Sequence, residues 1–148
     1  MDFMGNDIKK VLITGATGFL GKTICEHFGK SNKDIIKVSS KNLDGYKKID
    51  LLDLKTTSET FRKISPDLVI HCAANVPKNS IKTNSKKFLT NNIEMFKNLI
   101  FSTKCPIINM SSMTVYSENS SETYSECEKI VKTDSNYANA KLEIEKEF

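Results

Sequence analysis

The order of apolar and amphipathic segments predicts an α/β fold with a doubly wound parallel sheet. Three observations predict it: five short strand-like segments, helical patterns that alternate with them, and a glycine-rich turn directly after the first strand. Strands that alternate with helices pair in parallel, because each helix carries the chain back to the same end of the sheet. Strands are expected at residues 10–14, 35–39, 47–50, 67–72 and 105–110, and helices at 19–29, 55–64, 85–103 and 137–148.

The first strand leads into a turn suited to a phosphate group. Residues 11–14 are apolar or β-branched, as in a strand buried on both faces, and a helical pattern starts at residue 19. Between them, Gly15 permits a tight turn and Gly18 lets backbone N–H groups approach a pyrophosphate, while Gly21 lets the helix pack close to the sheet. A turn that merely uses glycine is the alternative. The candidate cofactor-binding residues here are Gly15, Thr17, Gly18, Phe19, Leu20 and Gly21.

The later segments are bounded by local signals. Ser65-Pro66-Asp67 ends one helix and starts the next strand, since the residue before proline disfavours helix. Residues 117–135 are rich in Ser and Glu, and we expect a loop there over the mouth of an active site.

Composition excludes several classes of protein. With 148 residues and 39% hydrophobic content, the chain can form one core but not two sizeable domains. It has no apolar run long enough for a membrane span and no leader, so we expect a cytoplasmic protein without a membrane partner. Its four cysteines lack CxxC spacing, which predicts reduced thiols and no metal site. The net charge of +4 comes from scattered lysines, which argues against a nucleic-acid partner.

The last predicted helix carries a phenol and an ammonium one turn apart. Tyr137 and Lys141 are i and i+4, so they share one helix face. A tyrosine titrates near pH ~10, and a nearby positive charge lowers that pKa toward a useful range for proton transfer. A surface pair with no chemical role is the alternative. Ser112 follows the fifth strand, where doubly wound folds place their ligand crevice.

Taken together, these motifs resemble those of the extended short-chain dehydrogenase/reductase superfamily. The similarity is to its NAD-dependent epimerase/dehydratase type, which includes nucleotide-sugar epimerases and dTDP-4-dehydrorhamnose reductases. Between the glycine turn and the Tyr137 helix, four further motifs occur in that family's order: Asp50-Leu51-Leu52-Asp53, His71-Cys72-Ala73-Ala74, Asn92-Ile93 with Asn98-Leu99-Ile100, and Ser111-Ser112-Met113-Thr114-Val115-Tyr116. One departure is Ser117, where the family usually has glycine.

The resemblance implies a Rossmann-like NAD(P)-binding domain over residues 1–148, without the family's C-terminal substrate domain. It implies that Ser112 orients the substrate, Tyr137 is the general acid/base, and Lys141 supports the phenolate and holds the nicotinamide ribose. Ser111 is the fallback for Ser112, and Asn91 for Asn92. Further cofactor-binding residues implied are Asp50 and Leu51 at the adenine, then Cys72, Ala73, Ala74 and Asn92. His71 is expected to be a packed strand-end residue. An apolar face left exposed allows a homodimer.

The residues leave two choices partly open: NADP or NAD as the cofactor, and epimerisation or reduction as the reaction. Ser40 and Lys41 occupy the place where an acidic residue would hold the ribose of NAD, so NADP is favoured over NAD. Met113 and Thr114 stand where related 4,6-dehydratases carry acids, which disfavours dehydration. A nucleotide-sugar epimerase or a keto-sugar reductase, in polysaccharide biosynthesis, is then expected. The alternative is a non-catalytic dinucleotide-binding module or an inactive fragment of such an enzyme.

Overall fold

Five parallel strands form one sheet in the order β3-β2-β1-β4-β5, which confirms the predicted fold class. The computed structural model describes residues 8–76, 85–116 and 134–147. The strands are β1 (Lys10–Thr14), β2 (Asp34–Ser39), β3 (Lys47–Lys48), β4 (Leu68–His71) and β5 (Ile107–Asn109). The helices are α1 (Phe19–Phe28), α2 (Leu54–Ile64), α3 (Lys86–Ser102) and α4 (Asn136–Glu145), with a 3₁₀ turn, η1, at Met113–Val115.

The chain divides into two units, which are treated separately below. The first, here called the sheet unit, contains residues 1–74 and 97–110; the second, the Tyr137 unit, contains residues 75–96 and 111–148. Helix α3 contributes residues 86–96 to the Tyr137 unit and 97–102 to the sheet unit. The predicted loop over 117–135 lies almost entirely outside the described residues.

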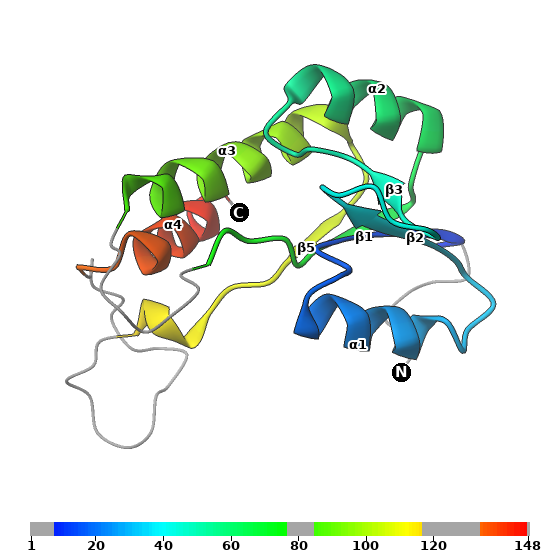
Figure 1. Ribbon diagram of the computed structural model, residues 1–148, viewed down its shortest axis with the longest axis horizontal. Coiled ribbons are helices and arrows are strands. Elements are labelled where there is room, and N and C mark those ends of the chain that lie inside the picture. Colours follow the sequence, from blue (N-terminus) through cyan, green and yellow to red (C-terminus); the bar gives the residue numbers. More distant parts are fainter. Residues whose placement is uncertain (1–7, 77–84, 117–133, 148) are drawn as a thin grey trace. The chain divides into compact units, whose positions relative to one another are not determined.

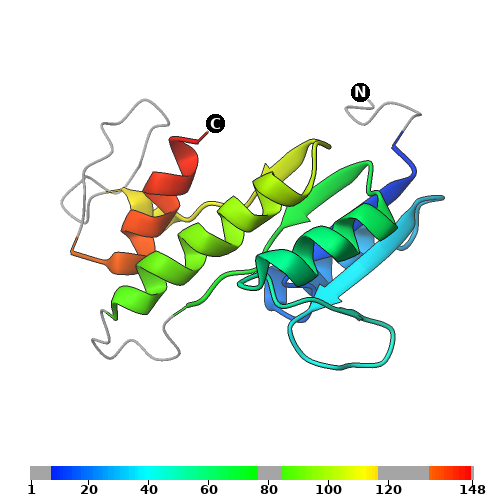
Figure 2. The same ribbon diagram turned by 90° about the horizontal axis from the view of Figure 1, so that it is seen from above.

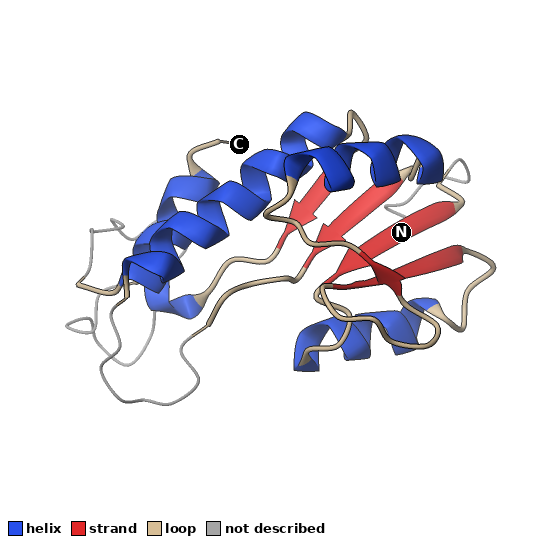
Figure 3. Cartoon of the chain, turned by 45° about the horizontal axis from the view of Figure 1, so that its top comes forward, coloured by secondary structure: helices blue, strands red, loops and turns tan. Residues whose placement is uncertain are grey.

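In the sheet unit, α1 covers one face of the sheet and α2 the other (Figures 1 and 3). The last turn of α3 lies beside α2 (Figure 2), where the Ser58 and Ser102 hydroxyls are 2.8 Å apart and share a hydrogen bond. Strands β1 and β4 are central, and residues 11–14 and 68–71 are all buried. This explains the unbroken apolar sequence of residues 11–13 and 68–70, because a strand covered on both faces has no polar side to present.

The third strand is shorter than the predicted 47–50. The Ile49 N–H still donates to the carbonyl of Ser39, the last residue of β2, at 2.9 Å. The Asp50 carbonyl then accepts from the Asp53 N–H at 3.0 Å, which turns the chain into α2. Asp53 caps that helix by accepting from the Thr56 N–H at 3.1 Å. The ladder therefore ends here, because the turn carries the chain away from β2 and into α2.

Candidate functional site

The glycine turn after β1 has the geometry that a phosphate site requires. Gly15 has φ = 63°, in the left-handed region that glycine favours. The Gly18 N–H donates to the Gly15 carbonyl at 2.9 Å, which closes the turn just before α1. Gly18 also precedes the first residue of α1 and offers no side-chain cap, so N–H groups of the helix's first turn have no intrahelical acceptor. Such a helix end favours an anion.

Two of the glycines are required by close packing. A Cβ on Gly15 would lie 2.5 Å from the backbone nitrogen of Ala73, which follows β4. A Cβ on Gly21 would lie 2.2 Å from the Gly15 carbonyl oxygen. Gly21 thus packs against the turn itself, whereas the sequence suggested that it packs against the sheet. At Gly18 the corresponding distance to the same oxygen is 3.3 Å, a contact that a small shift would relieve.

A buried hydrogen-bond chain joins the ends of β1 and β4 beside this turn. The Thr14 hydroxyl is 2.7 Å from His71 Nδ1 and accepts from the Ala73 N–H at 3.2 Å. The Thr14 hydroxyl has one proton and two lone pairs, so it can pair with either tautomer of the imidazole. His71 is only 1% exposed, as expected of a packed strand-end residue. The chain of bonds fixes Cys72 and Ala73 against Gly15, so these predicted cofactor residues lie together.

Two further segments of the sheet unit were predicted to contact the cofactor. Ser39 is buried and its hydroxyl accepts from the Lys41 N–H at 3.0 Å, whereas Ser40 and Lys41 are exposed. After β3, Asp50 is exposed while Leu51 is 5% exposed. The exposed side chains of Ser40, Lys41 and Asp50 could reach a ligand, whereas the buried Ser39 and Leu51 hold the backbone of these segments in place.

Sequence reasoning did not assign a role to two buried polar residues near Asp50. The Thr57 hydroxyl donates to the Asp50 carbonyl at 3.1 Å, and Asn98 Nδ2 donates to the Leu51 carbonyl at 2.8 Å. A signal was present for Asn98: a polar residue sits beside the apolar stripe of a helix that includes Phe96 and Leu99. The partner carbonyl could not be identified from that signal.

In the Tyr137 unit, the three predicted catalytic residues come together. Ser112 precedes η1 and its hydroxyl accepts from the Thr114 N–H and hydroxyl, at 3.3 and 2.9 Å. Ser112 also forms a side-chain hydrogen bond with Tyr137. The Lys141 ammonium lies 5.9 Å from the centre of the Tyr137 ring, on the same face of α4. Ser135 caps α4 by accepting from the Ala138 N–H at 3.2 Å.

The pKa of Tyr137 differs from the expectation. Burial raises it above its usual value of 10.0, and the hydrogen bond from Ser112 lowers it by less. The sequence predicts a net decrease of this pKa, caused by the nearby positive charge of Lys141. In the protein alone, removal of the phenolate from water has the larger effect, because a buried anion loses its hydration. Lys141 itself is 3% exposed.

Ser111 and Asn92 take structural positions. The Ser111 hydroxyl donates to a carboxylate oxygen of Glu145. Asn92 is 2% exposed, accepts from the Asn75 N–H at 2.7 Å, and donates to the carbonyls of Asn75 and Phe88 at 3.0 and 2.6 Å. The Asn92 side-chain amide therefore holds the chain just after Ala74, because it pairs with both the N–H and the carbonyl of Asn75, as the backbone of a neighbouring strand would. Asn91, the fallback, accepts from the neighbouring Thr90 hydroxyl at 3.4 Å, its one side-chain hydrogen bond among the residues described.

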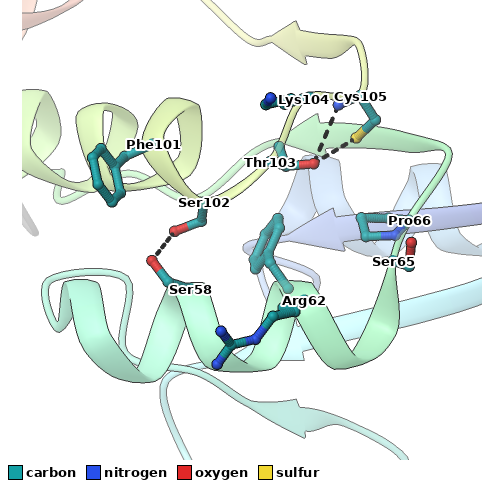
Figure 4. Close-up of a pocket in the computed structure, with 10 residues that line it drawn as sticks. Ser58, Arg62, Ser65, Pro66, Phe101, Ser102, Thr103, Lys104 and Cys105 are labelled. Carbon is teal, nitrogen blue, oxygen red and sulfur yellow. Dashed lines mark hydrogen bonds between the residues drawn. The ribbon is translucent and has the colours of Figure 1, made fainter.

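A pocket of about 520 Å³ lies elsewhere in the sheet unit, between α2 and the end of α3 (Figure 4). Its lining includes Arg62, Phe101 and Cys105. The Thr103 hydroxyl donates to Cys105 Sγ at 3.1 Å. The lining segments precede β4 and β5, so the pocket is at the amino ends of the strands. The glycine turn follows the carboxyl end of β1, and the pocket is therefore not the predicted cofactor site.

Within the described ranges, no cluster of His, Cys, Asp or Glu could hold a metal ion, and no helix could cross a membrane. Among the described residues, Cys25, Cys72 and Cys105 form no disulfide; Cys127 lies outside the described residues.

Sequence similarity to known proteins identifies the family of this chain. Residues 11–148 match the model of the NAD dependent epimerase/dehydratase family. GDP-L-colitose synthase from Yersinia pseudotuberculosis is 32% identical over 112 residues, 72% of this chain and 34% of that protein. Methionine adenosyltransferase 2 subunit beta from Rattus norvegicus is 31% identical over 67 residues, 45% of this chain and 20% of that protein. The chain thus spans about a third or less of these curated relatives.

Solved structures show the same fold. UDP-glucose 4-epimerase from Brucella ovis, in complex with NAD, aligns with a TM-score of 0.82 at 22% identity over 94% of this chain and 46% of that one. A hypothetical dTDP-4-dehydrorhamnose reductase from Sulfolobus tokodaii aligns with a TM-score of 0.79 at 26% identity, over 93% and 50%. The matched family model extends from β1 through α4, across both the glycine turn and the Tyr137 helix. The chain belongs to the NAD dependent epimerase/dehydratase family.

Proposed function

We propose that the protein containing this chain oxidises or reduces a nucleotide-sugar by hydride transfer, as an epimerase or a keto-sugar reductase. The observation that carries the proposal is the hydrogen bond between Ser112 and Tyr137, with the Lys141 ammonium 5.9 Å from the phenol ring. A hydroxyl that orients a substrate oxygen, a phenol that exchanges its proton and a cation that supports the phenolate form an acid–base site. GDP-L-colitose synthase, a relative named for a nucleotide-sugar, supports the substrate class.

The glycine turn fits the diphosphate of a nicotinamide dinucleotide. Gly15 allows the left-handed turn that packs against Ala73, and the N–H groups at the start of α1 suit an anion. We assign Gly15, Thr17, Gly18, Phe19, Leu20 and Gly21 to the diphosphate half, and Ser40, Lys41, Asp50, Leu51 and residues 72–74 to the adenosine half. The bound dinucleotide supplies or accepts the hydride. Ser112 would hold the reacting oxygen, and Tyr137 would donate or accept its proton.

The residues after Ser112 support redox chemistry without dehydration. Met113 is 65% exposed and has no ionisable group, and the Thr114 N–H and hydroxyl are both bonded to Ser112. Neither side chain can remove or deliver a proton at a sugar carbon near neutral pH. One relative, 26% identical over 100 residues, is named dTDP-glucose 4,6-dehydratase (Salmonella typhimurium). Because this name is that of a dehydratase, the type of reaction requires a direct test.

The test uses the phenol of Tyr137 as the reporter. We expect ultraviolet titration, with Tyr137→Phe as the blank, to give a pKa above 10 for the chain alone. Saturating NADP⁺ or NAD⁺ should lower it, because the oxidised nicotinamide ring is positive. The control is Tyr46→Phe, a tyrosine of the sheet unit, whose difference spectrum should not respond. A Tyr137 pKa that both nucleotides leave unchanged, although they bind, would remove Tyr137 from the reaction.

A second candidate function is a dinucleotide-binding module without turnover. The match to methionine adenosyltransferase 2 subunit beta, a protein named as a subunit, favours it. Under this alternative the nucleotide binds through the sheet unit and the Tyr137 titration does not respond, so the same experiment separates the two functions.

A further inference from the structure

The segment after β3 is held by two buried side chains from different helices. Thr57 of α2 is 0% exposed and its hydroxyl donates to the Asp50 carbonyl at 3.1 Å. Asn98 of α3 is 7% exposed and its amide donates to the Leu51 carbonyl at 2.8 Å. Two successive carbonyls are thus fixed by residues 7 and 47 positions away in the chain. All four residues belong to the sheet unit.

The Asp50 carboxylate is held by this segment yet keeps one oxygen for a ligand. Its Oδ1 accepts from the Leu52 N–H at 3.1 Å, and Oδ2 accepts no hydrogen bond from the residues that the structure describes. Asp50 is exposed, whereas Ile49 and Leu51 on either side are 1% and 5% exposed. The anchored neighbours therefore determine where the carboxylate lies.

We propose that Asn98, assisted by Thr57, is a positioning residue that holds Asp50 for recognition of the adenine amino group of the dinucleotide. This inference rests on the proposed function, which assigns Asp50 to the adenine. Without its amide donor, the buried Leu51 carbonyl would be unpaired. A buried carbonyl without a partner is unfavourable enough to move a loop toward water. The Asp50 carboxylate would move with it and lose its alignment with the amino group.

The experiment measures preference for adenine, which a general loss of stability does not alter. Dissociation constants for NADPH and for its hypoxanthine analogue are determined on the same sample of each variant. Hypoxanthine has a carbonyl oxygen in place of the 6-amino group of adenine, so it lacks the donor proposed to meet the Asp50 carboxylate; its remaining donor on that edge, N1–H, lies at a different position. We expect the wild-type chain to prefer adenine about tenfold or more, the range for a hydrogen bond to a charged group. Asp50→Asn is the reference variant, with the preference largely lost.

Asn98→Leu, which keeps the side-chain size but removes the donor, should reduce the preference to about threefold or less. Thr57→Val should also reduce the preference for adenine. If Asn98→Leu does not fold, the Thr57→Val result decides whether this segment is positioned by its buried donors. The matched control is Ser102→Ala, which removes the hydrogen bond between α3 and α2 without touching the Asp50 segment. It should retain the wild-type ratio.

The outcomes separate this inference from the proposed function. If the wild-type chain binds neither nucleotide, both fail. If it prefers adenine and Asp50→Asn abolishes the preference, while Asn98→Leu and Thr57→Val leave it unchanged, the positioning role is wrong and the proposed function stands. A wild-type ratio near one would refute the placement of adenine at Asp50, and the role of Asn98 with it.

Discussion

Replacing Gly15 by alanine tests whether the glycine turn is defined by its contact with β4. Two of the glycines that the structure describes have a left-handed backbone: Gly15, with φ = 63°, and Gly45, with φ = 73°. An added Cβ at Gly45 would meet nothing within 4 Å, whereas at Gly15 it would lie 2.5 Å from Ala73 N and 2.6 Å from Cys72 C. Gly45→Ala therefore measures backbone strain alone, and Gly15→Ala measures strain plus overlap.

The expected magnitudes follow from these distances. A left-handed conformation costs alanine about 1–2 kcal/mol, which reduced entropy of the unfolded chain offsets by about 0.4–1 kcal/mol. Gly45→Ala should thus destabilise by about 1 kcal/mol or less. At Gly15 the overlap adds about 1–3 kcal/mol, and displacement of Ala73 weakens its hydrogen bond to Thr14 by about 1 kcal/mol. We expect about 2–5 kcal/mol in total for Gly15→Ala.

Urea unfolding followed by far-ultraviolet circular dichroism measures both variants, since the chain has no tryptophan for a fluorescence assay. NADPH should stabilise Gly45→Ala as it does the wild type, and Gly15→Ala much less. If the two variants have free energies of unfolding within about 0.5 kcal/mol of each other, the contact with β4 does not define the turn.

Three other predictions concern charge. The folded protein holds the Tyr137 proton more tightly than the unfolded chain does, so the free energy of unfolding should fall as the pH rises above 10. The fall should be smaller in Tyr137→Phe. Thermal melts of both proteins at pH 9 and 11 measure the difference. The Asp67 carboxylate accepts from the N–H groups of Lys10 and Lys9 at 2.8 and 3.0 Å, bonds that lower its pKa below 3.8. Its contribution to stability should be present above pH 3.8 and lost as the pH falls through its folded pKa. Asp67→Asn should therefore flatten acid unfolding relative to Asp34→Asn. Finally, Lys41→Ala should weaken NADPH binding about five- to tenfold while leaving NADH binding unchanged, as measured by calorimetry; equal losses for both would contradict an NADP preference.

Local sequence predicted most of the fold because each element carries its own pattern. Residues 10–14 form a strand as predicted, and α1 ends one residue before its predicted limit. Two strands are shorter than predicted: β3 ends at Lys48 where the pattern indicated residues 47–50, and β5 covers Ile107–Asn109 where it indicated residues 105–110. After β3 the chain turns at Asp50 into α2, and hydrophobic periodicity carries no information about where such a turn begins.

The sequence by itself determined the fold class and the position of the glycine turn. Short-range patterns suffice for these, since they record which residues are apolar and which backbone conformations are permitted. Through the family resemblance it also predicted Ser112, Tyr137 and Lys141 as the catalytic residues, which stays a prediction. Only the tertiary structure decided that Gly15 meets Ala73, that Asn98 reaches Leu51, and that burial raises the pKa of Tyr137. Those facts depend on contacts between residues tens of positions apart, and hence on how the elements pack, which no single element's pattern contains.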